Sequence, residues 1–195
     1  CYAVKGHDLF DKNGLKFISD LKSAGAKKVW VDYKLHDTPD TVFLRAQALK
    51  EHGADIITVH ASGGMDMMAA AVRTGVTVYA VTVLTSLSVS ECQQTYGSET
   101  VSKVLSIAQM AAGAGVHGIV SSPQELAPLR KEFPTNPLLA TPGTRSPGVA
   151  AGSQKRITTP VEAIRSGCDI LVIGSEITKD SDPLAAYLRL VESIK

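Results

Sequence analysis

The stretch VDYKLHDTPDT, residues 31–41, places two carboxylates and an ammonium within six positions at the end of a β-branched run. Asp32 and Lys34 are two positions apart, so on a strand they face the same side, and Asp37 lies in the turn that follows. Such a cluster can stabilise charge that develops during a reaction and can deliver a proton. On these residues alone, an Asp–Lys pair that closes a strand end is an equally good interpretation.

Short apolar runs alternate with helical patterns along the chain. The runs are too short for helices and continuous enough for strands that are buried on both faces. We expect strands at 2–4, 28–33, 55–60, 77–84, 118–122, 137–141 and 169–174. We expect helices at 11–25, 38–53, 64–75, 99–115, 123–132, 159–167 and 182–194. This alternation predicts βα units and a parallel sheet.

Two architectures fit these elements: an open doubly wound sheet, or a (β/α)8 TIM barrel whose first strand is absent from the sequence. Polar or glycine-rich groups follow nearly every expected strand. In a barrel these strand ends converge on one face, whereas an open sheet would use only one or two of them. We therefore expect a single barrel domain over residues 1–195, in which Lys5 adds a second ammonium to the cluster from a neighbouring strand.

The composition excludes several functional classes. The chain has 195 residues, is 44% hydrophobic and carries a formal net charge of +1, so it does not predict binding to nucleic acid or to an anionic membrane. It lacks an apolar run of about 18 residues that could span a bilayer, and it lacks a signal-peptide pattern. Cys1, Cys92 and Cys168 are widely spaced, which predicts free thiols in a reducing, cytoplasmic compartment.

The charged stretch also carries a family resemblance. DYKLHDTPDTV is similar to the D-x-K-x-x-D-I-P-x-T signature of the orotidine 5′-monophosphate decarboxylase family, and later motifs follow in order: HASGG, VTVLTS, TPGTR, SQKRITTP and VIG. D-x-K-x-x-D alone is shared with hexulose phosphate synthases and ketogulonate phosphate decarboxylases. Pro39 and Thr41, together with LTS and TPGxR, select the orotidylate branch.

This resemblance implies decarboxylation of orotidine 5′-monophosphate to UMP, the last step of de novo pyrimidine nucleotide synthesis, without a metal or organic cofactor. It assigns an alternating array of catalytic charges to Lys5, Asp32, Lys34 and Asp37, in which Lys34 protonates the carbanion at C6 of the pyrimidine. It also implies a homodimer in which Asp37 and Thr41 are contributed across the interface.

The resemblance further implies which residues bind the substrate. They are His7, Thr41, Thr85, Ser86, Gly143, Arg145, Gln154, Gly174 and Ser175. Gln154 corresponds to a glutamine that bridges base and phosphate from the loop 143–156. The family usually has an arginine where this chain has Ser175, and a serine cannot supply a bidentate cation. Binding of the phosphate then depends on Arg145, Arg156 or Lys179.

Two alignments of the N-terminus are possible. Matching Gly6, Leu9 and Phe10 to a bacterial K-x-G-x-x-L-F pattern puts Val4 in the lysine position and turns Lys5 away from the site. Matching K-G-H to the K-T-H of eukaryotic members keeps Lys5 inward and makes His7 a ligand contact, and we prefer this alignment.

Two other functions stay open. One is a related metal-dependent sugar-phosphate decarboxylase or aldolase, which would need an added acidic ligand. The other is a non-catalytic barrel that binds a nucleotide or serves as a partner surface, which Ser175 and the missing first strand suggest.

Overall fold

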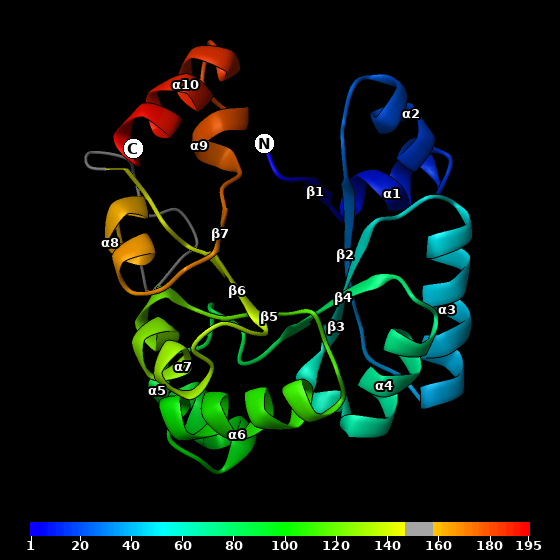
Figure 1. Cartoon of the computed structure of the whole chain (residues 1–195), viewed down its shortest axis with the longest axis vertical. Helices are drawn as coiled ribbons and strands as arrows, with labels where there is room; N and C mark the ends of the chain where they lie inside the picture. Colours follow the sequence, from blue (N-terminus) through cyan, green and yellow to red (C-terminus); the bar gives the residue numbers. More distant parts are fainter. Residues whose placement is uncertain (147–157) are drawn as a thin grey trace. The chain divides into compact units, whose positions relative to one another are not determined.

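The computed structural model describes residues 1–146 and 158–195 (Figure 1). These residues fold into two compact units. Unit 1 contains residues 1–82 and 107–119, and unit 2 contains residues 83–106 together with the described part of 120–195. Helix α6 (Thr100–Gly113) and strand β5 (Gly118–Val120) are divided between the units. A single domain over the whole chain stays a prediction.

Unit 1 is built on a parallel sheet in which each strand pairs with the next one along the chain. Its strands are β1 (Val4–Gly6), β2 (Val29–Leu35), β3 (Ile56–His60) and β4 (Thr77–Val81). Its helices are α1 (Asp8–Asn13), α2 (Phe17–Ser23), α3 (Pro39–Glu51), the 3-10 turn η1 (Ala61–Gly63) and α4 (Met65–Arg73). The parallel βα units expected from the sequence are therefore confirmed in this unit.

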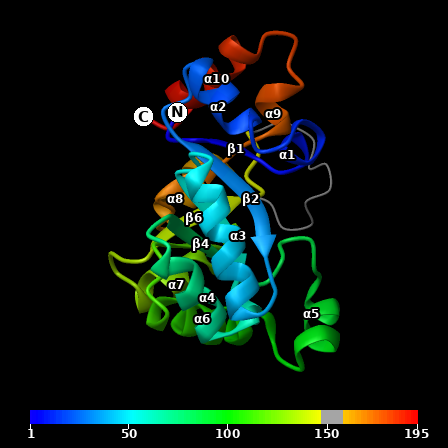
Figure 2. The same cartoon turned by 90° about the vertical axis from the view of Figure 1, so that its right-hand side faces the viewer.

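Helices α3 and α4 lie side by side in both views of the molecule (Figures 1 and 2). Their buried faces carry small and aliphatic side chains, among them Val42, Ala46 and Leu49 of α3 and Met67 and Ala71 of α4. Burying these side chains against the sheet strands contributes most of the stability of such a unit, because each aliphatic side chain removed from water is worth about 1.5–3 kcal/mol. The charged cluster lies at the end of β2, just before α3 begins.

The start and end of α3 follow from its sequence. Pro39 occupies the first turn, where its missing N–H would have no intrahelical partner and its fixed φ already suits a helix. The helix ends at Glu51, His52 is its C-cap, and Gly53 follows with φ of 94°, a conformation that glycine adopts without steric cost. The residues directly before this helix, 36–38, form the turn that leaves β2.

Unit 2 contains a parallel pair of strands and several short helices. Its strands are β6 (Leu138–Pro142) and β7 (Ile170–Val172), paired from Ala140 with Ile170 to Pro142 with Val172. Its helices are α5 (Val89–Tyr96), the 3-10 turn η2 (Pro123–Glu125), α7 (Leu126–Glu132), α8 (Pro160–Arg165), α9 (Ser175–Thr178) and α10 (Pro183–Ser193). Asp169 joins the two strands because its carboxylate accepts the Leu139 N–H at 2.7 Å and pairs with Arg130.

Several expected elements need correction. The first strand begins at Val4 rather than at residue 2. The expected helix 11–25 is two helices, α1 and α2, because Gly14 adopts φ of 71° and ends the first. Helix α5 was missed, although Ser88 and Glu91 form a capping box, which is a recognisable signal for a helix start. Helix α9 was also missed, since four residues give no periodicity.

Two expectations about the chain as a whole can be compared with the structure. Cys1, Cys92 and Cys168 take part in no disulfide within the part of the chain that the structure describes. Within residues 1–146 and 158–195, no helix has the length and apolar character needed to cross a bilayer.

Candidate active site

The charged cluster lies where β2 departs from regular strand geometry. The pairing of β2 with β3 shifts between Val31 and Leu35, so β2 has extra residues there. Lys34 has φ of 49°, the one positive value among the non-glycine residues that the structure describes. Tyr33 contacts the ring of Phe10 edge to face, with centroids 6.2 Å apart. The irregularity therefore turns Tyr33 toward α1 while Asp32 and Lys34 meet each other, in the way that bulges re-aim side chains near active sites.

Asp32 is the centre of the cluster. Its Oδ2 accepts hydrogen bonds from the Lys34 ammonium at 2.7 Å and from the Lys5 ammonium. The Asp32 side chain is only 3% exposed, whereas the side chains of Lys5 and Lys34 are 24% and 36% exposed. One buried carboxylate is thus shared by two ammoniums that still reach solvent, and any ligand that replaces this solvent would meet both of them.

The ionisation of Asp32 follows from these contacts. Burial alone would raise the pKa of the carboxyl, because a charged group loses its hydration. The nearby charge of Lys5 and the hydrogen bonds from Lys34 and Lys5 outweigh burial, so the pKa of Asp32 is lowered from 3.8. Asp32 is therefore a carboxylate at neutral pH.

Lys5 approaches this carboxylate from the neighbouring strand. In the pairing of β1 with β2, Lys5 is opposite Trp30, two residues before Asp32. Its side chain is directed onto Asp32, which is the orientation required by matching K-G-H, whereas Val4, the alternative, is exposed. His7 is mostly exposed, and its Nδ1 accepts the Asp8 N–H at the start of α1. The roles of Lys5 and His7 toward a substrate stay predictions.

Asp37 and Thr41 lie apart from the Lys5–Asp32–Lys34 cluster. Asp37 accepts the N–H of Thr38 at 2.7 Å, and it forms no ion pair within the part of the chain that the structure describes. Thr41 accepts a hydrogen bond from the Thr38 hydroxyl at 3.0 Å. Asp37 is exposed and Thr41 partly so. Both positions are therefore accessible to another molecule rather than joined to their own cluster.

A pair of histidines flanks the cluster. The rings of His36 and His60 are 5.4 Å apart, and Gly63 keeps the following turn close, since a Cβ there would lie 2.9 Å from His36. The Nδ1 of His60 is buried and has no hydrogen-bond partner among the described residues. Burial, followed by the charges of His36 and Lys34, lowers the pKa of His60 below 6.5. His60 is therefore neutral at pH 7, and His36 and Lys34 are among the groups that disfavour its protonation.

The remaining expected substrate contacts belong to unit 2. Ser86 is exposed and Thr85 partly buried, in the segment that follows β4. Gly143 has φ of 83°, which lets the chain turn after β6, and the guanidinium of Arg145 donates to the carbonyl of Thr144 at 2.7 Å. Gly174 precedes α9, and open space lies where its Cβ would be. Gln154, with Arg156, lies outside the described residues.

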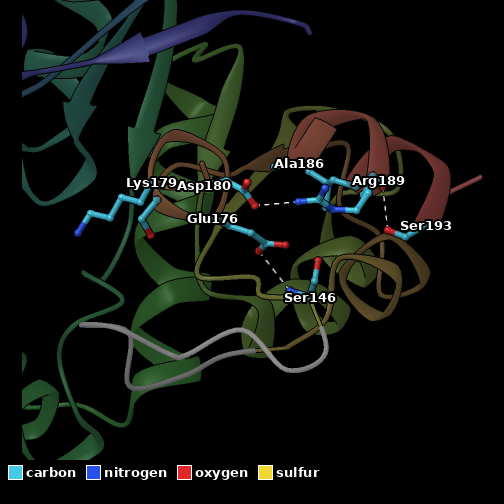
Figure 3. Close-up of a pocket in the computed structure, with 9 residues that line it drawn as sticks. Ser146, Glu176, Lys179, Asp180, Ala186, Arg189 and Ser193 are labelled. Carbon is cyan, nitrogen blue, oxygen red and sulfur yellow. Dashed lines mark hydrogen bonds and ion pairs between the residues drawn. The ribbon is translucent and has the colours of Figure 1, made fainter. Parts of the chain in front are cut away.

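Unit 2 also contains a cavity of about 540 Å³ (Figure 3). It is lined by Ser146, Ser175, Glu176, Lys179, Asp180, Ala186, Arg189, Leu190 and Ser193. Glu176 accepts the Ser146 N–H at 3.2 Å, and Arg189 pairs with Asp180 at 2.8 Å. The resemblance left the phosphate to Arg145, Arg156 or Lys179, because Ser175 stands where the family has an arginine. Of these three cations, Lys179 lines the same cavity as Ser175. Of the expected binding residues in the described range, this cavity includes Ser175 only.

Two features of the site have no motif that marks them. Trp30 lies within the expected strand 28–33, and the contact of its ring with the Lys5 ammonium leaves no signal in the sequence. The cavity residues of α10 belong to the expected helix 182–194, and no motif distinguishes them from other residues of a terminal helix. No group of three or more His, Cys, Asp or Glu side chains that could hold a metal ion occurs within residues 1–146 and 158–195.

Comparisons with known proteins place these features in a family. Residues 3–190 match the sequence model of the "Orotidine 5'-phosphate decarboxylase / HUMPS family". The orotidine 5'-phosphate decarboxylase of Anaeromyxobacter sp. (strain K) is 42% identical over 185 residues, which cover 93% of this chain and 81% of that protein. The enzyme of the same name from Streptococcus pneumoniae serotype 19F (strain G54) is 40% identical over 194 residues, covering 95% and 82%.

Solved structures agree with the sequence relatives. The crystal structure of orotidine 5'-phosphate decarboxylase from Lactobacillus acidophilus has a TM-score of 0.83 and 33% identity, covering 98% of this chain and 86% of that chain. An uncharacterized conserved protein from Geobacillus kaustophilus also has a TM-score of 0.83, with 31% identity and coverage of 99% and 88%. The α/β fold of the TIM-barrel type that the sequence predicted is therefore confirmed.

Proposed function

We propose that this chain, which belongs to the orotidine 5'-phosphate decarboxylase / HUMPS family, decarboxylates orotidine 5'-phosphate to UMP without a cofactor. The observation that carries the proposal is the Lys5–Asp32–Lys34 cluster at the end of β2, in a chain whose relatives bear that enzyme name. A carboxylate shared by two ammoniums supplies the preorganised charge that such a reaction needs.

The chemistry explains why this cluster suits the reaction. Loss of CO2 from C6 of the pyrimidine leaves an electron pair with no adjacent electron sink, so the site must stabilise negative charge with fixed cations. The Lys34 ammonium stabilises this charge and then gives C6 a proton as general acid. Asp32 orients the Lys34 side chain before the substrate arrives, which is consistent with their 2.7 Å hydrogen bond. Lys5 places a second ammonium on the same Asp32 carboxylate oxygen, so the cluster carries one negative and two positive charges.

Substrate binding is assigned to the remaining expected residues by their resemblance to the family. Thr85 and Ser86 contact the pyrimidine, and Gln154 bridges the base and the phosphate. The phosphate lies near Gly143, Arg145, Gly174 and Ser175, with His7 as a further ligand contact. Remote phosphate binding contributes to the reaction because it fixes the orientation of the reacting ring.

We also propose a cytoplasmic homodimer in which Asp37 and Thr41 serve the site of the partner subunit. Support for this assignment comes from the exposure of Asp37 and from its lack of an ion pair among the residues that the structure describes. An exposed carboxylate that does not contact the cluster of its own subunit is available to complete a second site in the dimer.

The experiment is the ultraviolet absorbance change of orotidine 5'-phosphate on mixing with the protein in EDTA. We expect turnover in wild type and a loss of at least about 100-fold in Lys34→Ala, the scale of a lost general acid. Lys16→Ala is the matched control, because Lys16 is an exposed lysine with a weak 3.6 Å ion pair, and we expect wild-type turnover from it.

Two results would contradict the proposal. Turnover of a sugar phosphate but not of orotidine 5'-phosphate, dependent on added divalent metal, would indicate the related aldolase or decarboxylase. UMP binding without turnover by folded wild type would indicate a non-catalytic barrel, and recovery of turnover in Ser175→Arg would then identify weak phosphate binding as the cause.

A further inference from the structure

Trp30 is the single tryptophan of the chain, and it lies beside the catalytic cluster. It is 2% exposed. Its indole N–H donates to the hydroxyl of Thr58 on β3 at 2.7 Å, and its ring packs edge to face on Tyr79 of β4, with centroids 4.8 Å apart. Contacts from two successive strands therefore fix both the position and the tilt of the indole.

The side chain of Lys5 contacts both this indole and Asp32. Lys5 and Trp30 are paired residues of β1 and β2, and the Lys5 ammonium is 5.6 Å from the centroid of the indole ring. This distance is within reach of a cation–π attraction, for which tryptophan is the best of the aromatic side chains. The same ammonium donates to Asp32. The ammonium is thus held from two sides by groups that are both buried.

The second contact matters because the Lys5 side chain is flexible and 24% exposed. A lysine held by one ion pair at the edge of solvent spends part of its time in other rotamers. If Lys5 leaves Asp32, the carboxylate is bonded to Lys34 alone, and the ammonium of Lys34 is then held more tightly by it. Lys34 would be less free to direct its charge and its proton toward a substrate.

We propose that Trp30 is a positioning residue that holds the Lys5 ammonium on Asp32 and so keeps Lys34 available to the substrate. The inference rests on the proposed function for its catalytic consequence, but the contact between indole and ammonium can be tested separately. It acts through Lys5, so its loss lowers kcat and leaves KM nearly unchanged.

The first experiment measures kinetics in Trp30→Leu and Trp30→Phe. Removing the ring is expected to lower kcat about tenfold, the size of a well-formed cation–π contact, with KM within about twofold of wild type. Trp30→Phe keeps an aromatic face and is expected to retain most of kcat. A folded Trp30→Leu with wild-type kcat would overturn the inference, as would equal losses of kcat in the two variants.

The second experiment leaves Trp30 intact and measures its fluorescence. Indole emission responds to nearby charge, so Lys5→Met should shift the emission spectrum, while Lys16→Met, which removes an exposed ammonium, should not. Near-ultraviolet circular dichroism checks that both variants are folded. Identical spectra for wild type and Lys5→Met would refute the contact, even where Trp30→Leu fails to fold. Absence of turnover in wild type would refute the proposed function instead, and the fluorescence result would stand independently.

Discussion

Replacing Asp32 by asparagine removes the carboxylate that the ammoniums of Lys5 and Lys34 share. The amide keeps nearly the same shape and one oxygen acceptor, so the change is electrostatic rather than steric. Two cations would then face a neutral group that is buried in wild type. We expect Asp32→Asn to be both less stable and much less active.

The magnitude follows from the two hydrogen bonds that are weakened. A hydrogen bond to a charged group is worth about 1.5–3 kcal/mol, and the lower value applies here because solvent reaches both lysines. Two such bonds give about 3 kcal/mol, and the remaining amide oxygen recovers roughly a third, which leaves about 2 kcal/mol of lost stability. Loss of a preorganised charge at the reacting atoms lowers kcat by about 100-fold or more.

Urea unfolding and orotidine 5'-phosphate turnover measure the two effects. The pKa of Asp32 is lowered in the folded chain, so the ionised carboxylate adds to the free energy of unfolding. This contribution is fully present above pH 3.8 and is lost as the pH falls below that value. The free energies of unfolding of wild type and Asp32→Asn should therefore converge in acid. Asp20→Asn is the control, since Asp20 has only an exposed 3.6 Å pair with Lys16, worth less than about 1 kcal/mol. An Asp32→Asn protein with wild-type turnover and unfolding midpoint would refute the reasoning.

Three further predictions concern stability. Thr159→Ala should lower the free energy of unfolding in urea by about 1 kcal/mol, because the Thr159 side chain caps the start of α8. A loss no greater than that of Ser19→Ala, a change at an exposed serine, would contradict the capping role. Folding lowers the pKa of His60, so the free energy of unfolding should decrease as the pH falls below 6.5. His60→Asn should make the free energy of unfolding less dependent on pH between about pH 7.5 and 5.5. An unchanged dependence on pH would count against this role of His60. Gly118→Ala should lower the thermal midpoint by the equivalent of about 1–3 kcal/mol, because its Cβ would lie 2.8 Å from the Tyr79 ring, and a midpoint equal to wild type would show that the ring can move.

The parallel βα organisation was predictable because buried strands have an unmistakable pattern. Runs such as residues 28–33 are apolar and β-branched, and small residues end the helices before them. The boundaries were less predictable where single residues decide them. Gly14 divides the expected helix 11–25, and the capping box of Ser88 and Glu91 starts a helix that the apolar pattern did not suggest. Both helix boundaries depend on local hydrogen bonds at the helix ends, which hydrophobic periodicity does not reveal.

The contact between Asp32 and Lys34 could be predicted from strand alternation, although this alternation is only part of its cause. Alternation along a regular strand puts residues two apart on one side, yet β2 is irregular there. The predicted orientation of Lys5 depended on which of two alignments was chosen. The contact of Lys5 with Trp30 could not be predicted, because the sequence of a strand does not indicate which neighbouring side chain a long side chain will contact. Residues of unit 2 such as Arg145 and Gly174 were expected from motifs, and their roles stay predictions.

The backbone of Lys34 connects the fold to the chemistry. A non-glycine residue at φ of 49° costs on the order of 1–3 kcal/mol, and the sequence could have avoided this cost with glycine. Glycine, however, has no ammonium. The hydrogen bond from Lys34 to Asp32 at 2.7 Å and the register shift of β2 hold the residue in this conformation. Lys34 alone of the described non-glycine residues is held this way, and the proposed function accounts for the strain, because it requires a cation that is directed out of the end of a strand toward a substrate.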